Sequence, residues 1–324
     1  MVLSVIIPTY INKIRSPDRL LLTITGYLHQ KLDKELYEVI IVNDGSKFEI
    51  EEHIYKNIKD LENIRIENKQ HTGMCSSLNY GVSLAKGEYV LIGVDDNIPS
   101  YDCLYNLYVA IDSDKGNSQS IYIGKEYFLF HVTGMKDIIE CTYFRGINEN
   151  SYKERYKEEL SIFPNISLRD IETRYNELLY VAKEEDSHKQ FANFLDNKSL
   201  INYHWLCLRP GALVMKTIIY NELEGFDEKF DPSGWYSDLE FGYRLSKKGI
   251  KMRYLNDFTM IHLNHMRIDC NPKVENQCFE YLINKYNNVD MYMLPFIWFD
   301  SKLETYVNHV ERVKKHIKLT GERD

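Results

Sequence analysis

The stretch Val2-Leu-Ser-Val-Ile-Ile-Pro-Thr-Tyr10 indicates the fold class. A short, unbroken apolar run that ends at a proline is typical of a strand buried on both faces, as in a parallel sheet. The same pattern returns in Val39-Ile-Ile-Val42, before Asn43-Asp-Gly-Ser46, and in Tyr89-Val-Leu-Ile-Gly-Val94, before Asp95-Asp-Asn97. Buried strands therefore recur in the first part of the chain, and each is followed by polar residues.

Helix-forming segments separate these strands. One begins at Ser16-Pro-Asp18, where a capping serine, a proline and a first-turn acid coincide, and runs to Gln30. Others are predicted over 49–60 and 74–86, on either side of a short strand at 64–66. The alternation predicts an α/β fold with a doubly wound, mostly parallel sheet and helices on both faces. Because ligands of such sheets bind beyond the carboxyl ends of the strands, we expect the polar clusters to meet at one edge.

The rest of the chain carries weaker patterns. Segment 121–132 predicts one or two strands, 237–248 a helix, and the highly charged 151–190, within a variable insertion near 140–200, solvated helices or a mobile insertion. The tail from 276 is helical in pattern, and its end over 302–318 is amphipathic. The apolar side of that last helix carries Val307, Val310, Val313 and Ile317.

Composition excludes several classes of protein. The 324 residues are 44% hydrophobic and 27% charged, which is ordinary for a soluble globular chain. The net charge of −8 argues against a nucleic-acid-binding surface. The six cysteines form no C-x-x-C pair and are predicted to be reduced thiols of a cytoplasmic protein. No apolar run approaches the ~20 residues of a membrane-spanning helix, and the N-terminus lacks the basic region of a signal peptide.

The acidic cluster Asp95-Asp-Asn97 is the first candidate site. Adjacent carboxylates at a strand end suit Mg²⁺ or Mn²⁺, which could in turn hold a diphosphate, although a surface turn explains the same residues. Neither G-x-G-x-x-G nor G-x-x-x-x-G-K-[ST] occurs in the sequence, which argues against an ordinary dinucleotide-binding or P-loop protein.

The second candidate is Gly234-Trp-Tyr-Ser-Asp-Leu-Glu-Phe241, which opens the helix predicted over 237–248. Ser237 and Glu240 have the spacing of a capping box, so a structural reading explains both. Asp238 in the first turn also favours the helix dipole, but this structural reading does not explain the two aromatic residues just before it, and an acid beside aromatic residues can also act as a general base. Further on, His262 and His265 are three residues apart, and imidazole is a ligand for Mn²⁺ or zinc when it is not simply structural.

Several of these segments, in this order, resemble the family-2 glycosyltransferases of GT-A fold. The matching segments are Ser4–Tyr10, Val39–Ser46, Asn79-Tyr-Gly81, Ala85–Leu91, Val94–Asn97, Gly225–Phe230 and Gly234–Leu245. The resemblance spans roughly residues 2–265 and does not cover the stretch near 140–200 or the tail.

The resemblance implies a role for each matching residue. The nucleotide-binding positions are Pro8, Thr9, Tyr10, Asp44, Gly73, Asn79 and Asp95. The ligands of a Mn²⁺ or Mg²⁺ cofactor are Asp96 and His262, with His265 as the alternative. Asp238 is implied to be the catalytic base, and the residues that contact acceptor or sugar are Trp235, Tyr236 and Ser237.

Three positions depart from the family pattern. Asn97 replaces an acid, which is expected to weaken metal binding, and Ser237 replaces a glutamate that contacts the acceptor in the family. Leu78 stands where an arginine is common, so diphosphate contacts are expected to differ.

We therefore predict an inverting hexosyltransferase that moves a sugar from a nucleotide-diphosphate sugar, with UDP favoured, to an acceptor hydroxyl. Glycans, lipid-linked molecules, small molecules and peptides all remain open as acceptors. Two alternatives remain: a degenerate, non-catalytic protein that binds nucleotide sugars, and a nucleotidyltransferase.

The resemblance also suggests a division of the chain. We expect a GT-A domain over 1–265, with a nucleotide-binding half at 1–97 and an acceptor half at 98–265, followed by a C-terminal helical extension at 266–324. The apolar Met291–Phe299 favours packing of this extension on its own domain, with a homodimer or a peripheral membrane contact as alternatives.

Overall fold

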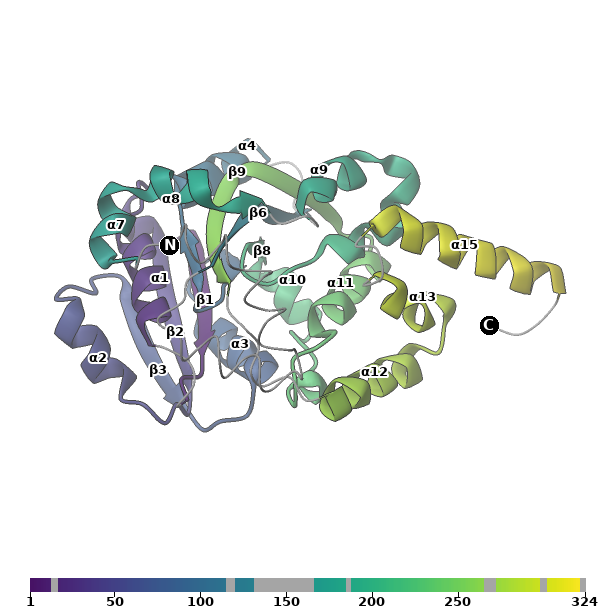
Figure 1. Cartoon of the computed structure of the whole chain (residues 1–324), viewed down its shortest axis with the longest axis horizontal. Helices are drawn as coiled ribbons and strands as arrows, with labels where there is room; N and C mark the ends of the chain where they lie inside the picture. The colour runs from purple at the N-terminus through teal and green to yellow at the C-terminus, as the bar shows by residue number, and fades with distance from the viewer. Residues whose placement is uncertain are drawn as a thin grey trace, which may run out of the picture.

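The computed structural model describes residues 1–12, 17–114, 120–130, 166–184, 188–264, 272–297 and 302–320. Within them, one nine-stranded sheet runs in the order β3-β2-β1-β4-β8-β6-β9-β5, and β7 pairs with β6 (Figure 1). The strands are β1 (Leu3–Thr9), β2 (Tyr37–Asp44), β3 (Ile64–Lys69), β4 (Tyr89–Ile92), β5 (Asn97–Pro99), β6 (Ser120–Phe130), β7 (Lys183–Glu184), β8 (Leu213–Lys216) and β9 (Lys251–Asn264).

The N-terminal half of the sheet is parallel, as predicted. β1 pairs in parallel with both β2 and β4, and β2 pairs in parallel with β3. Val5, Ile6 and Ile7 are all fully buried, because cores on both faces of the sheet cover the side chains of β1. The unbroken apolar run in the sequence therefore reflects a strand that is covered on both faces.

The second half of the sheet is mixed. β8 is antiparallel to β4, β6 is antiparallel to β8, and β5 is antiparallel to β9. The long strand β9 runs parallel to β6, with one irregularity in register between Gly124 and Lys125. The parallel pattern thus holds where strands and helices alternate and ends where β8 enters the sheet.

Helices cover both faces of the sheet, as predicted. The longer ones before β9 are α1 (Asp18–Leu28), α2 (Ile50–Asn57), α3 (Met74–Ser83), α4 (Cys103–Ser113), α9 (His188–Asp196) and α11 (Ser237–Lys247). The short α-helices are α7 (Leu168–Thr173), α8 (Tyr175–Val181) and α10 (Thr217–Glu222), and the 3₁₀ helices are η1 (Lys34–Leu36), η2 (Lys198–Cys207) and η3 (Glu228–Phe230). After β9 come α12 (Pro272–Tyr286), α13 (Val289–Tyr292), η4 (Leu294–Phe296) and α15 (Leu303–Thr320).

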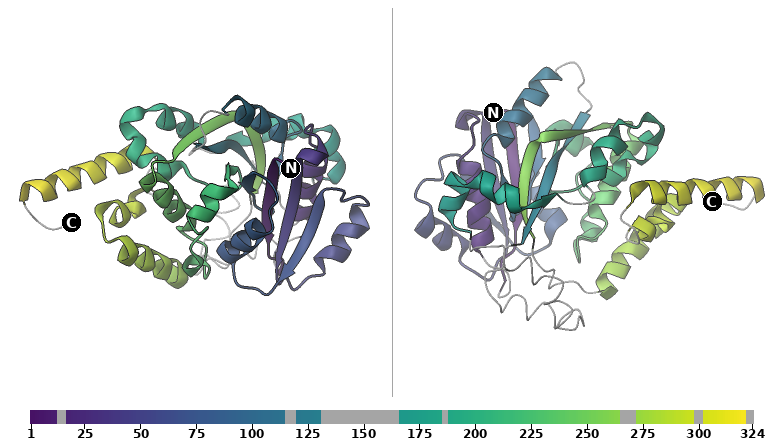
Figure 2. Two further views of the ribbon diagram at one scale, coloured as in Figure 1. Left: turned by 180° about the vertical axis from the view of Figure 1, so that it is seen from behind. Right: turned by 45° about the horizontal axis from the view of Figure 1, so that its top comes forward.

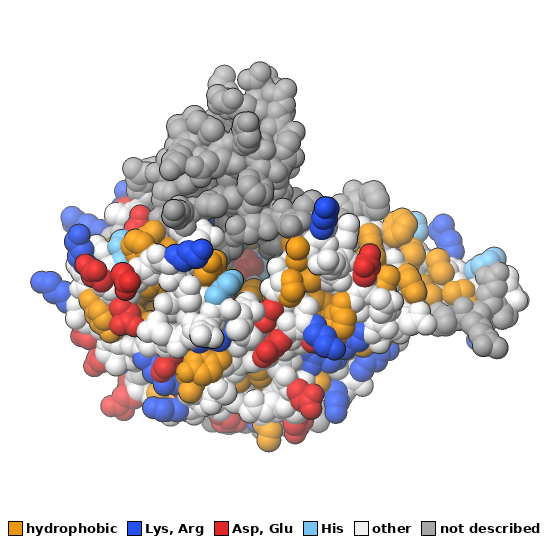
Figure 3. All heavy atoms as spheres, turned by 90° about the horizontal axis from the view of Figure 1, so that it is seen from below, with side chains coloured by type: hydrophobic (Ala, Val, Ile, Leu, Met, Phe, Trp, Pro, Cys, Tyr) orange, Lys and Arg blue, Asp and Glu red, His pale blue; other side chains and the backbone are white. Residues whose placement is uncertain are grey.

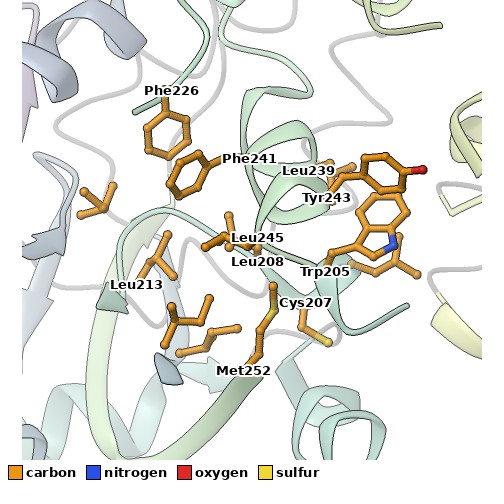
Figure 4. Close-up of a cluster of buried hydrophobic side chains, with 14 of the residues drawn as sticks. Trp205, Cys207, Leu208, Leu213, Phe226, Leu239, Phe241, Tyr243, Leu245 and Met252 are labelled. Carbon is orange, nitrogen blue, oxygen red and sulfur yellow. The ribbon is translucent and has the colours of Figure 1, made fainter. Parts of the chain in front are cut away.

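Alternate residues of β1 enter two separate cores. Ile6 packs with α3 and α11, whereas Val5 and Ile7 pack with α1, α2 and α4 on the opposite face. The first core extends to Trp205 and Phe241, which Figure 4 shows among the buried side chains around α11. The period of two along a buried strand thus places the helices on both faces.

The C-terminal helices join the first of these cores. Leu303, Tyr306, Val307 and Val310 of α15 are buried in it, and its apolar side is the one predicted. The rest of α15 projects away from the sheet (Figures 1 and 2). In the apolar stretch before it, Met291, Leu294 and Ile297 are buried while Tyr292 and Phe296 are exposed, so one side of its described part packs within the chain.

The charged stretch near 140–200 is partly described, and its described helices α7 and α8 are amphipathic. Ile171, Tyr175 and Leu178 of α7 and α8 are buried against Leu22 of α1, and the Tyr175 hydroxyl donates to the Ile98 carbonyl at 2.9 Å. The predicted helices are therefore solvated on one side only, because a narrow apolar stripe packs the other side on the domain. In the described part of the chain, no helix is long and apolar enough to cross a membrane.

Candidate functional site

The carboxyl ends of the parallel strands lie at one edge of the sheet. β3 points toward the lower side of Figure 1, and Figure 3 views that side and shows acidic side chains beside a recess. Thr9 ends β1 and Asp95 follows β4, and the Thr9 hydroxyl donates to the Asp95 carboxylate at 2.6 Å. The Thr23 hydroxyl donates to the Asp95 carbonyl at 3.1 Å. The structure thus brings two predicted nucleotide-binding residues together, and Pro8 lies beside them on β1.

Asp96 and His262, the predicted metal ligands, also meet. β5 pairs with β9 so that Asn97 faces His262, and the Asp96 carboxylate lies 3.4 Å from Nε2 of His262. Two atoms that each bind one ion at about 2.1 Å lie about 3.0–3.4 Å apart for octahedral to tetrahedral angles. This pair therefore fits a shared divalent ion.

Among the described residues, no group of three or more His, Cys, Asp and Glu side chains could hold a metal ion. The remaining ligands of an ion on Asp96 and His262 would thus have to come from elsewhere, such as a diphosphate or water. His265, the alternative ligand, lies outside the described residues.

Asn97 is buried behind this pair. Its amide donates to the Glu126 carboxylate, and Glu126 also lies 3.3 Å from Nε2 of the buried His188. Burial would raise the pKa of Glu126, but the hydrogen bond and charge of His188 outweigh it and lower that pKa. A Cβ at Gly211 would collide with both Asn97 and Glu126, so a glycine is required where that loop crosses them.

Asp44 is 3% exposed and is held by four donors. One carboxylate oxygen accepts from the Lys69 ammonium at 2.9 Å and the Thr72 amide at 3.0 Å. The other accepts from the Gly73 amide at 2.9 Å and from Nδ1 of His71 at 2.7 Å. Burial opposes ionisation, but these donors outweigh it and hold the pKa of Asp44 below its usual value.

Tyr10, another predicted nucleotide residue, stacks on His71. Their ring centroids are 4.1 Å apart and the rings are inclined by 15°. Tyr10, Asp44 and Gly73 thus form one group around the loop at residues 69–73, at the carboxyl end of β3.

Gly73 precedes α3 and has a φ of +123°. Asp231 lies against it, and the Asp231 carboxylate accepts from the amides of Cys75 and Ser76 at 2.6 and 3.0 Å. An acid from the second half of the chain thus caps a helix of the first half. Burial raises the pKa of Asp231 despite these hydrogen bonds.

Asn79 attaches the 220–228 turn to α3. Its amide nitrogen donates to the Phe226 carbonyl and to Glu228, and its amide oxygen accepts from the Tyr220 hydroxyl and the Phe226 amide. This structural role stands beside the expected position of Asn79 near the nucleotide, which stays a prediction.

The start of α11 also differs from the prediction. Tyr236 is the N-cap residue, with a φ of +67° and no capping side chain. Ser237 is fully buried, and its hydroxyl donates to the Gly234 carbonyl at 2.7 Å. The capping box is therefore absent, and the prediction that Ser237 contacts an acceptor was wrong. The partly buried Trp235 and Tyr236 form a ring pair, and Tyr236 packs on Phe279 of α12.

Glu240, the other residue of the predicted box, has a tertiary role. It is fully buried and accepts from Arg244 at 2.9 Å, Lys285 at 2.7 Å and the Tyr286 hydroxyl at 2.6 Å. Glu240 thus fastens α12 to α11.

Asp238 remains partly exposed at the start of α11. Its carboxylate lies 3.8 Å from Nη1 of Arg209, which also donates to the Leu208 carbonyl at 2.7 Å. Arg209 is two residues before Gly211, which lies against Asn97. One short segment therefore contacts both the candidate base Asp238 and the acidic cluster at 95–97. No sequence pattern singled out Arg209, Glu126 or Asp231, because their partners are distant in the chain.

Comparison with known proteins gives a consistent result. The family model described as Glycosyl transferase family 2 matches residues 4–169. Chondroitin synthase of Escherichia coli is 27% identical over 264 residues, which cover 80% of this chain and 34% of the synthase. The chain thus spans about a third of the length of that relative.

Solved structures of S. aureus TarS share the fold. The complex of TarS 1–349 with UDP has a TM-score of 0.54 at 14% identity and covers 98% of this chain and 72% of TarS 1–349. The complex with UDP-GlcNAc has a TM-score of 0.51 at 15% identity, with 98% and 73% covered.

Proposed function

The chain belongs to glycosyl transferase family 2, and from this premise we propose that it transfers a sugar from a UDP-sugar to an acceptor hydroxyl with inversion. The meeting of Asp96 with His262 carries the proposal. This pair stands beside the Thr9–Asp95 hydrogen bond, at the sheet edge where ligands of α/β proteins bind. The UDP and UDP-GlcNAc complexes of TarS support the choice of donor.

The residues divide the work as follows. Tyr10 and Asp44 hold the base, Asp95 binds the ribose, and Asp96 with His262 holds Mn²⁺ or Mg²⁺. The ion, when bound, neutralises charge on the departing diphosphate. Hydrogen bonds from the Thr9 and Thr23 hydroxyls keep Asp95 in place.

Asp238 is the proposed general base. It accepts the proton of the acceptor hydroxyl as that oxygen attacks the anomeric carbon. The bond from that carbon to the diphosphate oxygen breaks, and its electron pair leaves with the diphosphate. A single displacement from the opposite face inverts the anomeric configuration. Arg209, at 3.8 Å, orients the Asp238 carboxylate and is itself held by backbone carbonyls.

The free, buried thiols of Cys75, Cys103, Cys207 and Cys278 support a reducing, cytoplasmic location, which we include in the proposal. Acceptor identity is left to screening. A homodimer and a peripheral membrane contact stay predictions.

The test is ligand-induced stabilisation followed by turnover. UDP, GDP and ADP, each with and without Mn²⁺, are compared by thermal unfolding. At a ligand concentration 100 times the Kd, the expected gain is about 2.7 kcal/mol, a shift of a few degrees. We expect UDP with Mn²⁺ to give the largest shift, and UDP-GlcNAc to release UDP slowly by hydrolysis.

Two variants check the assignment of the metal site. Asp96→Asn removes a charged ligand and should abolish the Mn²⁺-dependent part of the shift. Asp257→Asn, an exposed change on β9, serves as the control. Equal Mn²⁺ dependence in both variants would refute the metal site, and no shift with any nucleotide would favour a degenerate, non-catalytic protein.

A further inference from the structure

The ring of His71 has the geometry of a bound base. It lies nearly parallel to Tyr10, with centroids 4.1 Å apart and a 15° tilt. Flat stacking on an aromatic side chain is also how proteins commonly hold nucleobases. Tyr10 is the aromatic residue to which the proposed function assigns the base.

The hydrogen bond of His71 completes the likeness. Its Nδ1 lies 2.7 Å from Oδ2 of Asp44. The lowered pKa keeps Asp44 ionised, and an ionised carboxylate only accepts hydrogen bonds. Nδ1 therefore carries the proton, and the imidazole presents to Asp44 a ring N–H like that of N3 in uracil.

The Asp44 carboxylate has no acceptor position to spare in this arrangement. A carboxylate offers about four lone-pair sites, and Lys69, Thr72, Gly73 and His71 each donate to one of its oxygens. A base N–H can reach this carboxylate only if one donor leaves. The Thr72 and Gly73 donors are backbone amides, and the Lys69 side chain is 16% exposed.

His71 is the donor best placed to leave. Its side chain is 54% exposed, and the neighbouring Gln70 and Thr72 are exposed as well. Its backbone approaches Gly45 closely, where a Cβ would lie 2.8 Å from the His71 amide nitrogen. The ring is thus brought to Asp44 by the turn while staying open to solvent.

We propose that His71 occupies the nucleobase position of the donor site and must swing out before UDP binds. This inference rests on the proposed function, because it takes Tyr10 and Asp44 as the base-binding residues. His71 then lowers the affinity of the donor site for UDP by competing with the base. The apparent Kd is the intrinsic Kd divided by the fraction of molecules with the ring displaced.

The experiment is calorimetric titration of UDP with Mn²⁺ into wild type and His71→Ala. If the ring is in place in about 90% of molecules, its removal should tighten UDP binding by about tenfold. A residue that instead helps to hold the base would show weaker binding on truncation. The sign of the change thus separates the two roles.

Further variants and a second ligand exclude indirect effects. His53→Ala is the matched control, since His53 also has an aromatic neighbour and an aspartate partner, Asp18, and should leave the Kd unchanged. His71→Asn keeps a polar side chain and should also bind UDP more tightly than wild type. Pyrophosphate with Mn²⁺ lacks a base, so its affinity should be the same in wild type and His71→Ala.

The outcomes separate this inference from the proposed function. Unchanged or weaker UDP binding in both His71 variants, with wild type binding normally, would overturn the role of His71 and leave the proposed function standing. An equal gain for pyrophosphate and UDP would also overturn it, since competition with a base cannot affect pyrophosphate. Failure of wild type and His71→Ala alike to bind UDP would overturn the proposed function, and this inference with it.

Discussion

The two halves of the site are built in different ways. In the N-terminal half, Thr9, Asp44 and Asp95 stand at the ends of parallel strands, and their hydrogen-bond partners lie within the first hundred or so residues. In the C-terminal half, Asp238 contacts Arg209 and its helix is fastened to α12 by Glu240. The N-terminal half of the site is formed by segments near in the chain and by the topology of the sheet, whereas the C-terminal half is formed by contacts between distant segments.

The loop before α3 shows the difference on a small scale. Asp44 and Asp231 both accept hydrogen bonds from backbone amides between Thr72 and Ser76. Asp44 has a lysine and a histidine as further partners and its pKa is lowered, whereas burial raises the pKa of Asp231. Asp44, which comes from the same half as the loop, is therefore readily ionised. Asp231 comes from the other half, and its burial disfavours the ionised form.

The largest expected effect concerns Asp238. Asp238→Asn removes the proposed base while keeping the shape of the side chain, so turnover should fall by about 10³-fold, or about 4 kcal/mol. The affinity for UDP should not change, because the general base lies in the C-terminal half of the site and the nucleotide-binding residues lie in the N-terminal half. UDP release from UDP-GlcNAc and calorimetry with UDP measure the two. Retention of turnover would show that the second half does not hold the base.

The next effect is on stability. Glu240→Ala leaves Arg244 and Lys285 without their shared buried carboxylate, which should cost about 3 kcal/mol in the free energy of unfolding. Urea unfolding measures it, with the exposed Glu280→Ala on the same α12 as control. A loss equal to that of the control would mean that α12 is attached by its apolar contacts alone.

Asp44→Asn should lower the free energy of unfolding by about 2 kcal/mol, less than Glu240→Ala, because the amide cannot accept hydrogen bonds from all four donors. In wild type, the pKa of Asp44 is lower in the folded than in the unfolded chain. The stability that Asp44 contributes is therefore present above about pH 4 and lost as the pH falls through the folded pKa. The variant should lose less stability than wild type below about pH 4. If the stability of the two proteins fell equally with acidification, this role of Asp44 would be contradicted.

Asp231→Asn should have the smallest effect, a loss of about 1 kcal/mol in the free energy of unfolding, because it alters the cap of α3. Asp231 makes stability depend on pH in the sense opposite to Asp44, because its pKa is raised in the folded chain. Above about pH 4 the folded chain binds more protons at Asp231, so acidification toward that pH favours folding. The variant lacks this gain and should lose more stability than wild type between the raised pKa and about pH 4. Unfolding at a series of pH values tests Asp44 and Asp231 together.

Much of the first half could be predicted from the sequence. Asp95 follows an apolar strand, and parallel strands bring their carboxyl ends to one edge, so its location at the same edge as Thr9 could be predicted, whereas their contact depends on the pairing of β1 with β4. Pairing of Asp96 with His262 was predicted only through the family resemblance. Ser237 and Glu240 were misjudged as a capping box, because their spacing fits that motif, whereas the Ser237 hydroxyl donates to the Gly234 carbonyl and Glu240 accepts from Lys285 and Tyr286 of the distant α12.

By itself the sequence determined the N-terminal parallel sheet, the helices on both faces, the amphipathic last helix and the acids at the strand ends. These features depend on hydrophobic period and on residues that are near in the chain. Only the tertiary structure decided that Asp231 caps α3, that Glu240 joins α11 to α12, and that His71 lies on Tyr10. Each of these depends on which distant donors and acceptors meet when apolar surfaces pack, because a buried polar group must find a partner wherever the fold brings one.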